Sequence, residues 1–329
     1  MAVPAETWKL PQISPRAFQH PADRAATAAL QQVPYLDQVV KRLIQLGYER
    51  ALRQANLGAS VRLGEQQLPH IWVLHREVFN VLDIGEVPDL YLSQFPIANA
   101  GTFGVGQPVV VLNSELVRLL DENALRAVLA HEAAHILSEH VLYQTATIIL
   151  ISLTNAARLP LLAGLPLMAI RTALLEWFRA AELSCDRAAA LATRDPMVVC
   201  RALMTIAAGE EAENLNLDAF IAQATEYSEK GRGMDRLSRL FLQMGLTHPL
   251  PVRRVHELLK WVREGEYDRI VGGDYVKRGE EHTLREEADA ASEHYADRVR
   301  AAFKDAGESI ADVGQQLSDW LAKQRDRGE

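Results

Sequence analysis

The sequence predicts a mainly helical α+β protein, in which long helices surround a small antiparallel sheet and a helical extension follows at the C-terminal side. Apolar residues recur at the i, i+3, i+4 spacing of amphipathic helices through most of the 329 residues. Two short segments, 89–93 and 109–112, are typical of strands. From about residue 279 the composition becomes charged and alanine-rich, with apolar positions still at helical spacing.

The segments before the first strand divide into an arm and two helical regions. Residues 1–20 carry three prolines and little periodicity, which predicts an extended arm. Helical patterns follow over 21–57 and 69–82. We expect one domain over 21–278, with 279–329 as an amphipathic tail that packs on the body, packs on a partner or stays solvated.

Composition excludes several classes of function. The net charge is −8 and no basic stripe is present, so nucleic acid is not an expected partner. Cys185 and Cys200 are the two cysteines, too few for a disulfide framework, which indicates a reducing compartment. Residues 1–10 lack the apolar core of a secretory signal. We therefore expect a cytoplasmic protein, with membrane association as the alternative.

An apolar region over 145–170 has two interpretations. Arg158, Pro160 and Pro166 interrupt it, and its uncharged halves are shorter than the ~20 residues that span a bilayer. It predicts a pair of buried or pocket-covering helices. The alternative is a hydrophobic hairpin that makes a peripheral membrane contact or binds an apolar substrate.

The strongest chemical signal is the pentapeptide HEAAH, His131 to His135, in a predicted helix that Asp121 caps. The i, i+4 spacing puts both imidazoles on one helix face, where they can hold one Zn²⁺. Glu132 then stands beside the metal to take a proton from water. Ten histidines in the chain make a chance match conceivable, so the motif needs support from other residues.

A catalytic zinc needs a third protein ligand, and a long predicted helix over 172–193 offers one. Glu182 and Asp186 share a helix face, so Glu182 could reach the metal while Asp186 holds the far nitrogen of a ligand histidine. Such a pair is a weak signal alone, but here its neighbours are mostly apolar. Cys185 points about 100° away from Asp186 around the helix, and we interpret it as a small buried residue.

Two further segments carry candidate residues. His248 precedes a proline, which predicts a loop position where it could stabilise an oxyanion or simply cap a helix. Arg254 could hold a substrate carbonyl or a structural carboxylate. The glycine-rich stretch 99–106 predicts a turn or a close backbone approach.

Together these motifs resemble the HtpX-like zinc metallopeptidases, gluzincins that include the CaaX prenyl-protein endopeptidases. HExxH, ExxxD, a His-Pro segment with a following arginine, and an upstream Asn-Ala occur in the family's order over about 70–262. The resemblance implies a zincin-like fold and one Zn²⁺ per chain. It implies the following site residues: His131, His135 and Glu182 as metal ligands, Glu132, His248 and Arg254 in catalysis, and Asp186 behind a ligand histidine.

The resemblance also implies a polypeptide substrate. Asn99, Ala100 and Gly101 would lead into an edge strand that pairs with an extended chain. The expected function is a zinc-dependent endopeptidase in protein quality control. The chain departs from the family in having Cys185 where alanine is usual, and in having the broken 145–170 region where many members have transmembrane helices.

Two other functions remain open at this point. The chain could bind zinc without proteolytic activity and act as an interaction protein, which stoichiometric zinc without cleavage would favour. It could also be a helical interaction protein without metal, with HEAAH as a coincidence. Neither the specific substrate nor the oligomeric state follows from the sequence.

Overall fold

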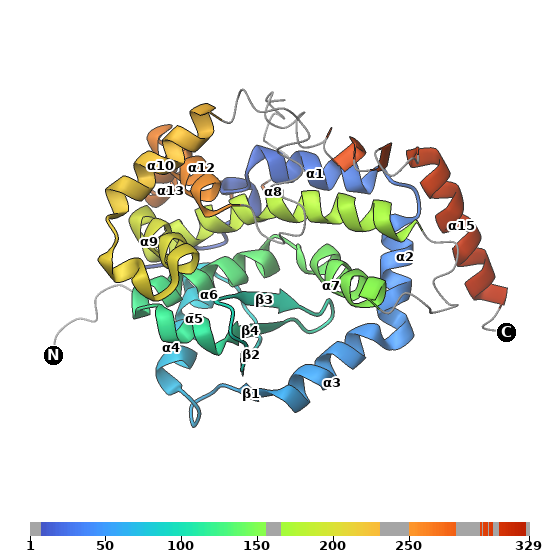
Figure 1. Cartoon of the computed structure of the whole chain (residues 1–329), viewed down its shortest axis with the longest axis horizontal. Coiled ribbons are helices and arrows are strands. Elements are labelled where there is room, and N and C mark those ends of the chain that lie inside the picture. Colours follow the sequence, from blue (N-terminus) through green and yellow to red (C-terminus); the bar gives the residue numbers. More distant parts are fainter. Residues whose placement is uncertain are drawn as a thin grey trace.

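The computed structural model describes residues 8–155, 166–230, 250–280, 297, 299–301, 303–304 and 309–326. These residues form a mainly helical fold with one small sheet, which confirms the predicted fold class. Helix α8 (Leu167–Thr193) crosses the molecule, and α6 (Glu122–Leu137) lies between α8 and the sheet (Figure 1). His248 and most of the 279–308 segment lie outside the described residues.

From residue 8 onward, the described part of the predicted N-terminal arm packs into the molecule. Leu10, Ile13 and Phe18 are buried, and Ile13 forms a bridge with Lys277. A short 3₁₀ helix, η1, spans Pro15–Ala17. The helical region that follows consists of α1 (Pro21–Gln31), α2 (Leu36–Leu43), the π-helical turn η2 (Ile44–Tyr48) and α3 (Glu49–Ala59).

The sheet has four strands in the order β1-β2-β4-β3. The strands are β1 (Ser60–Arg62), β2 (Asp89–Ser93), β3 (Ala100–Phe103) and β4 (Val109–Asn113). β1 with β2 and β3 with β4 are antiparallel, whereas β2 and β4 are parallel. The sheet is therefore mixed and not antiparallel throughout, because a tight hairpin after β3 returns β4 into the space between β2 and β3.

The glycine-rich stretch contains both the strand β3 and the hairpin. Gly104 has a φ of +101°, and a Cβ there would lie 2.9 Å from the carbonyl oxygen of Gln107. Only glycine fits such a turn without strain. The predicted close backbone approach is therefore at Gly104, while Gly101 lies within β3.

Helix α6 follows the sheet directly. Asp121 caps its first turn, because the Asp121 carboxylate accepts a hydrogen bond from the backbone N–H of Ala124, as the sequence predicts. Around it lie α4 (Pro69–Val81), α5 (Ser114–Leu119) and α7 (Val141–Asn155). The apolar region thus spans most of α7 and the start of α8, with 156–165 outside the described residues. Among the described helices, none combines the length and apolarity needed to cross a bilayer.

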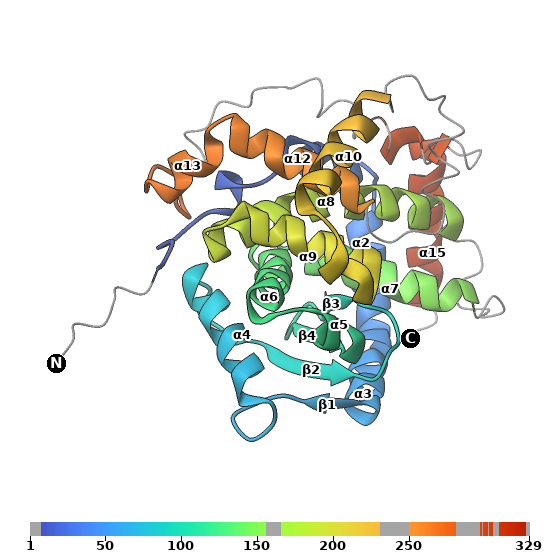
Figure 2. The ribbon, with the colours of Figure 1, turned by 60° about the vertical axis from the view of Figure 1, so that its left-hand side comes forward.

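The remaining helices are α9 (Pro196–Ala208), η4 (Gly209–Asn214), α10 (Leu217–Lys230), α12 (Pro251–Arg263), α13 (Glu266–Val271) and α15 (Ile310–Asp326). Of these helices, α9, α12 and α13 pack on α8, η4 lies against α9, α10 lies against α9 and α12, and α15 packs on α2 at the other end of the molecule (Figure 2). Helix α12 packs against both α8 and α9. It therefore brings Arg254 close to α8, the helix that contains Glu182 and Asp186.

Two hydrophobic cores meet on α8. The first contains the sheet, α4, α6, α9, α12 and the C-terminal part of α8 from Cys185 onward. The second contains α1, α2, α7, α15 and the N-terminal part of α8 up to Leu183. The segment 182–186, where the sequence predicts a ligand and its support, therefore lies at the boundary between the cores.

Candidate active site

The crossing of α6 and α8 brings the two motifs together in the interior. The Nε2 atoms of His131 and His135 lie 3.4 Å and 3.1 Å from the same atom, Oε1 of Glu182. All three side chains are buried. In a tetrahedral site with metal–ligand distances of about 2.0–2.1 Å, two ligand atoms lie about 3.3 Å apart. These two distances are those between neighbouring ligand atoms of a tetrahedral zinc site.

The far nitrogen of His131 has a carboxylate behind it. Nδ1 of His131 lies 3.1 Å from Oδ1 of Asp186, which is one helical turn beyond Glu182. The guanidinium of Arg254 in α12 holds Asp186 at two points, with Nε donating to Oδ2 at 2.8 Å and Nη2 to Oδ1 at 2.5 Å. Its Nη1 lies 3.2 Å from Oε2 of Glu182. Arg254 thus fixes both carboxylates that α8 contributes.

The two histidines of the motif differ in electrostatics. Burial alone would lower the pKa of His131, but Glu182 and Asp186 outweigh it and raise that pKa to about 9. The pKa of His135 is lowered, mainly by burial. The carboxylates of Glu182 and Asp186 thus stabilise positive charge at this point of the site. A bound divalent cation needs the same stabilisation.

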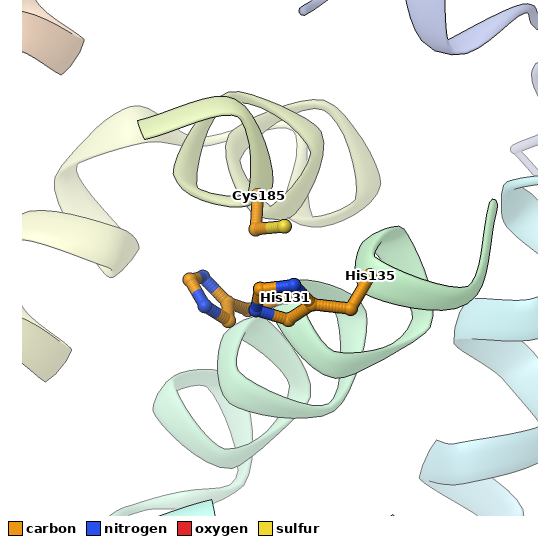
Figure 3. A group of neighbouring side chains, drawn as sticks. All are labelled: His131, His135 and Cys185. Carbon is orange, nitrogen blue, oxygen red and sulfur yellow. The ribbon is translucent and has the colours of Figure 1, made fainter. Parts of the chain in front are cut away.

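Cys185 is the other candidate for a third ligand. Its Sγ atom and ring nitrogens of His131 and His135 lie within 4.8 Å of one another, and Figure 3 shows it on α8 facing the two imidazoles of α6. A thiolate is the form that binds metal. Burial and the neighbouring carboxylates raise the pKa of Cys185 well above its usual value, which favours the neutral thiol. Its Sγ atom also lies 3.8 Å from Nδ1 of His140, the ring that contacts Nδ1 of His135. On this chemistry Glu182 is the better third ligand.

Glu132 is held by a residue that the sequence analysis did not identify. The hydroxyl of Thr102 in β3 donates to Oε2 of Glu132 at 2.7 Å, and both side chains are buried. No local pattern marks Thr102, because its contact with Glu132 depends on how β3 packs against α6. This hydrogen bond fixes the carboxylate beside the two histidines of the motif.

A cavity of about 380 Å³ opens onto these residues. Its polar wall contains His131, Glu132, Glu182 and Arg254, and Asn99 and Ala100 also line it. Gly101 belongs to β3 but does not line the cavity. The rest of the lining is mostly apolar and comes from α5, α6 and α9, namely Leu116, Ala127, Val128, Val199, Ala202, Leu203 and Ile206. The site can therefore hold an apolar group beside its polar centre.

Sequence reasoning also missed a buried chain behind His135. Its Nδ1 atom lies 3.2 Å from Nδ1 of His140, whose Nε2 lies 3.1 Å from Oδ2 of Asp23 in α1. His140 is close enough in sequence to have been suspected. Asp23 gives no such signal, since it lies 117 residues from His140 and meets it only through tertiary packing.

An HExxH helix with a carboxylate from a second helix defines a metallopeptidase of the zincin type. The comparisons agree: the model of peptidase family M48 matches residues 73–262, and the chain belongs to that family of zinc metalloendopeptidases. A plastoglobule-localized metallopeptidase 48 of the chloroplast of Arabidopsis thaliana is 36% identical over 259 residues, which cover 77% of this chain and 74% of the relative. No solved structure matches the chain.

The matched range agrees closely with the 70–262 over which the sequence resembles the family. The family resemblance and the enzyme class are thereby confirmed, and zinc is the metal on which the family depends. As a peptidase the protein binds polypeptide substrates. The roles of the individual side chains stay predictions, and His248 lies outside the described residues.

Proposed function

We propose that this chain is an active endopeptidase with one Zn²⁺ held by His131, His135 and Glu182. The observation that carries the proposal is the convergence of both Nε2 atoms on one Glu182 oxygen at the spacing of a tetrahedral site. When bound in such a site, zinc polarises both water and the carbonyl that it faces. The raised pKa of His131 supports the same assignment, because it reports a site that attracts positive charge.

Glu132 would act as general base and then as general acid. Its carboxylate takes a proton from the attacking water and passes it to the amine that leaves. The hydroxyl of Thr102 donates to one carboxylate oxygen, so that the other oxygen is directed toward the reacting atoms. Burial of the pair keeps bulk water from competing for these hydrogen bonds.

For Arg254 we propose a positioning role. Its Nε, Nη1 and Nη2 all approach carboxylate oxygens of Asp186 and Glu182, which supports the structural alternative over direct contact with a substrate carbonyl. Asp186 in turn orients His131 through its Nδ1 atom. Stabilisation of the oxyanion is then the proposed role of His248.

The substrate would bind in extended form along β3. Only β4 pairs with this strand among the described strands, so its other edge is available for a substrate strand. Asn99 and Ala100, which line the cavity, and Gly101 in the strand would supply backbone hydrogen bonds. Main-chain recognition selects extended, unfolded segments with little sequence preference, which fits a role in protein quality control.

The apolar wall of the cavity adds a preference to this recognition. Leu116, Val128 and Leu203 are among the side chains that would surround a substrate residue next to the scissile bond. We propose that this residue is apolar, since burial of a leucine-sized side chain contributes about 1.5–3 kcal/mol and a charged one would be left unpaired. Competing peptides that differ only at this residue would measure the preference as a ratio of kcat/KM values.

For the location we propose a reducing compartment, as the free and buried Cys185 and Cys200 suggest. The Arabidopsis thaliana relative is localised to plastoglobules of the chloroplast. For contact with a lipid surface we propose the exposed part of the 145–170 region, such as Met168, because Ala146, Ile149 and Leu150 are buried in the second core. Separation of cell extracts into aqueous and lipid-rich fractions tests this contact, and recovery in the aqueous fraction alone would contradict it.

The function is tested by Glu132→Gln on the purified protein, with an unfolded, disulfide-free protein as substrate. We expect a loss of about 10²–10⁴-fold in cleavage rate, with about one zinc still bound per chain. The matched control is Glu122→Gln in the exposed first turn of the same helix, which should cleave like the wild type. Full activity of Glu132→Gln would refute the assignment. Stoichiometric zinc without cleavage by the wild type would favour the zinc-binding interaction protein instead.

A further inference from the structure

We propose that His140 and Asp23 form a positioning chain behind the ligand His135, which makes the N-terminal helix α1 a part of the zinc site. Asp23 lies outside the range 73–262 that matches the family. The inference rests on the proposed function, because it assumes that His135 binds zinc through Nε2. It adds a residue from outside the shared peptidase core to the support of the metal.

The hydrogen-bond geometry favours one arrangement of protons. His135, His140 and Asp23 are all buried, and ring nitrogens link them at 3.2 Å and 3.1 Å. With an ionised Asp23, Nε2 of His140 donates, and in a neutral imidazole the other nitrogen, Nδ1, then accepts from Nδ1–H of His135. Nε2 of His135 then keeps its lone pair on the side of Glu182. This is the tautomer that can bind zinc.

The end of helix α6 explains how a residue five positions further on can reach His135. The backbone N–H of His140 donates to the carbonyl of His135 at 2.9 Å, and that of Glu139 to the carbonyl of Ile136 at 3.1 Å. With Glu139 at a φ of +57°, this pair of bonds forms a Schellman motif. The motif normally brings two apolar side chains together, and here it brings together two imidazoles.

Asp23 is held in place from several directions. Ser184, on α8 between Glu182 and Asp186, donates its hydroxyl to Oδ2 of Asp23 at 2.6 Å and accepts the backbone N–H of His20 at 2.9 Å. Gln19 and Thr27 also donate to the Asp23 carboxylate, at 3.2 Å and 3.3 Å. The carboxylate that supports His135 is therefore connected to α8, the helix that supplies Glu182.

Each ligand histidine thus has a buried carboxylate behind it. Asp186 contacts His131 directly, whereas Asp23 acts on His135 through the ring of His140. Such partners of ligand histidines set the tautomer and raise the basicity of the ligand nitrogen. A purely structural Asp23 would affect stability alone, so zinc affinity is the measurement that separates the two roles.

The experiment measures the zinc dissociation constant by competition with a chromogenic chelator, for the full chain and four variants. Asp23→Asn keeps volume and an acceptor oxygen, and His140→Phe keeps a ring against Trp177. We expect both to bind zinc at least about tenfold more weakly than the wild type. The controls are Asp37→Asn, which alters a partner of Tyr143, and His75→Phe, which alters a buried histidine bonded to the Pro88 carbonyl. These two should stay within twofold of the wild type.

A second measurement is the visible spectrum of the Co²⁺-substituted protein, which responds to the ligand field of His135. It should shift in Asp23→Asn and His140→Phe and not in the controls. If Phe at position 140 prevents folding, Asp23→Asn decides the question. Wild-type zinc affinity and spectrum in Asp23→Asn would overturn the inference while the proposed function stands. A wild-type chain that takes up no zinc would overturn both.

Discussion

The two hydrophobic cores differ in what they contribute to the active site. The first core, with the sheet, α4, α6, α9 and α12, lies mostly within the range that matches family M48 and surrounds the cavity. The second core draws α1, α2 and α15 from outside that range. Both cores share α8, and the candidate ligand Glu182 lies where they meet. The site is therefore built at a boundary where the family-matching segment supplies most of the first core but only α7 and part of α8 in the second.

The two motif histidines reflect this difference. His131 has its support from Asp186 and Arg254, both within the matched range. His135 stacks on Phe178 and has its support from His140 and, beyond it, Asp23 of the second core. His131 and His135 are one helix turn apart. The residues that support His131 lie within the family-matching range, whereas the support of His135 includes Asp23 from outside it.

We predict the largest effect for a substitution that disrupts the second core at Trp177. This side chain is 1% exposed, donates its indole N–H to Thr27 at 2.8 Å and packs edge-on against His140. Trp177→Ala should lower the free energy of unfolding by about 3–5 kcal/mol and also weaken zinc binding. Chemical denaturation and a zinc competition titration measure the two effects.

The comparison variant is Trp261→Ala in the first core, where the indole packs against Tyr267 and Arg187. It should cost a similar free energy of unfolding with little change in zinc affinity, because it does not contact the chain behind His135. Equal loss of zinc affinity in the two variants would show that the cores do not act separately on the site.

A second prediction concerns the pH dependence of zinc binding, because the pKa of His131 is raised whereas that of His135 is lowered. Because the pKa of His131 is raised from 6.5 to about 9, its proton stabilises the zinc-free fold fully below pH 6.5, and this contribution disappears as the pH rises through about 9. Zinc must displace that proton. The apparent zinc affinity should therefore rise about tenfold per pH unit up to pH about 9.

Titrations at several pH values in the range 6.5–9 measure this slope. Asp186→Asn removes one of the two carboxylates that raise the pKa of His131, so it should flatten the slope at its upper end. An affinity independent of pH over this range would mean that His131 is neutral in the zinc-free protein.

The smallest predicted effect concerns the sheet side of the site. Thr102→Val keeps the shape of a fully buried side chain but removes the hydroxyl that donates to Glu132. We expect kcat to fall about tenfold, because a hydrogen bond to a charged group contributes about 1.5–3 kcal/mol and other donors replace it in part. Zinc affinity should be unchanged. Steady-state kinetics and zinc content check this, and an unchanged kcat would remove Thr102 from the proposed catalytic arrangement.

The sequence predicted the parts of the site that depend on local spacing. HEAAH, the Asp121 cap and the Glu182–Asp186 pair are all readable from i, i+3 or i, i+4 relations within one helix. That Arg254 would reach a carboxylate was one of two stated alternatives. These relations survive folding because a helix keeps its own geometry wherever it packs.

What could not be predicted depends on contacts between distant segments. Thr102 meets Glu132 only through the packing of β3 on α6, and Asp23 meets His140 only because α1 lies on α8. The parallel pairing of β2 with β4 likewise follows from where the β3–β4 hairpin inserts, and neither strand's sequence specifies it.

The bidentate contact between Arg254 and Asp186 has a consequence for biosynthesis. The two residues are 68 positions apart, and Asp23 stands at the other end of the chain. A nascent chain that has not yet exposed α12 lacks the guanidinium that holds Asp186 and Glu182. We therefore expect the peptidase to acquire full activity only when most of the chain has left the ribosome and the segments before α12 have folded.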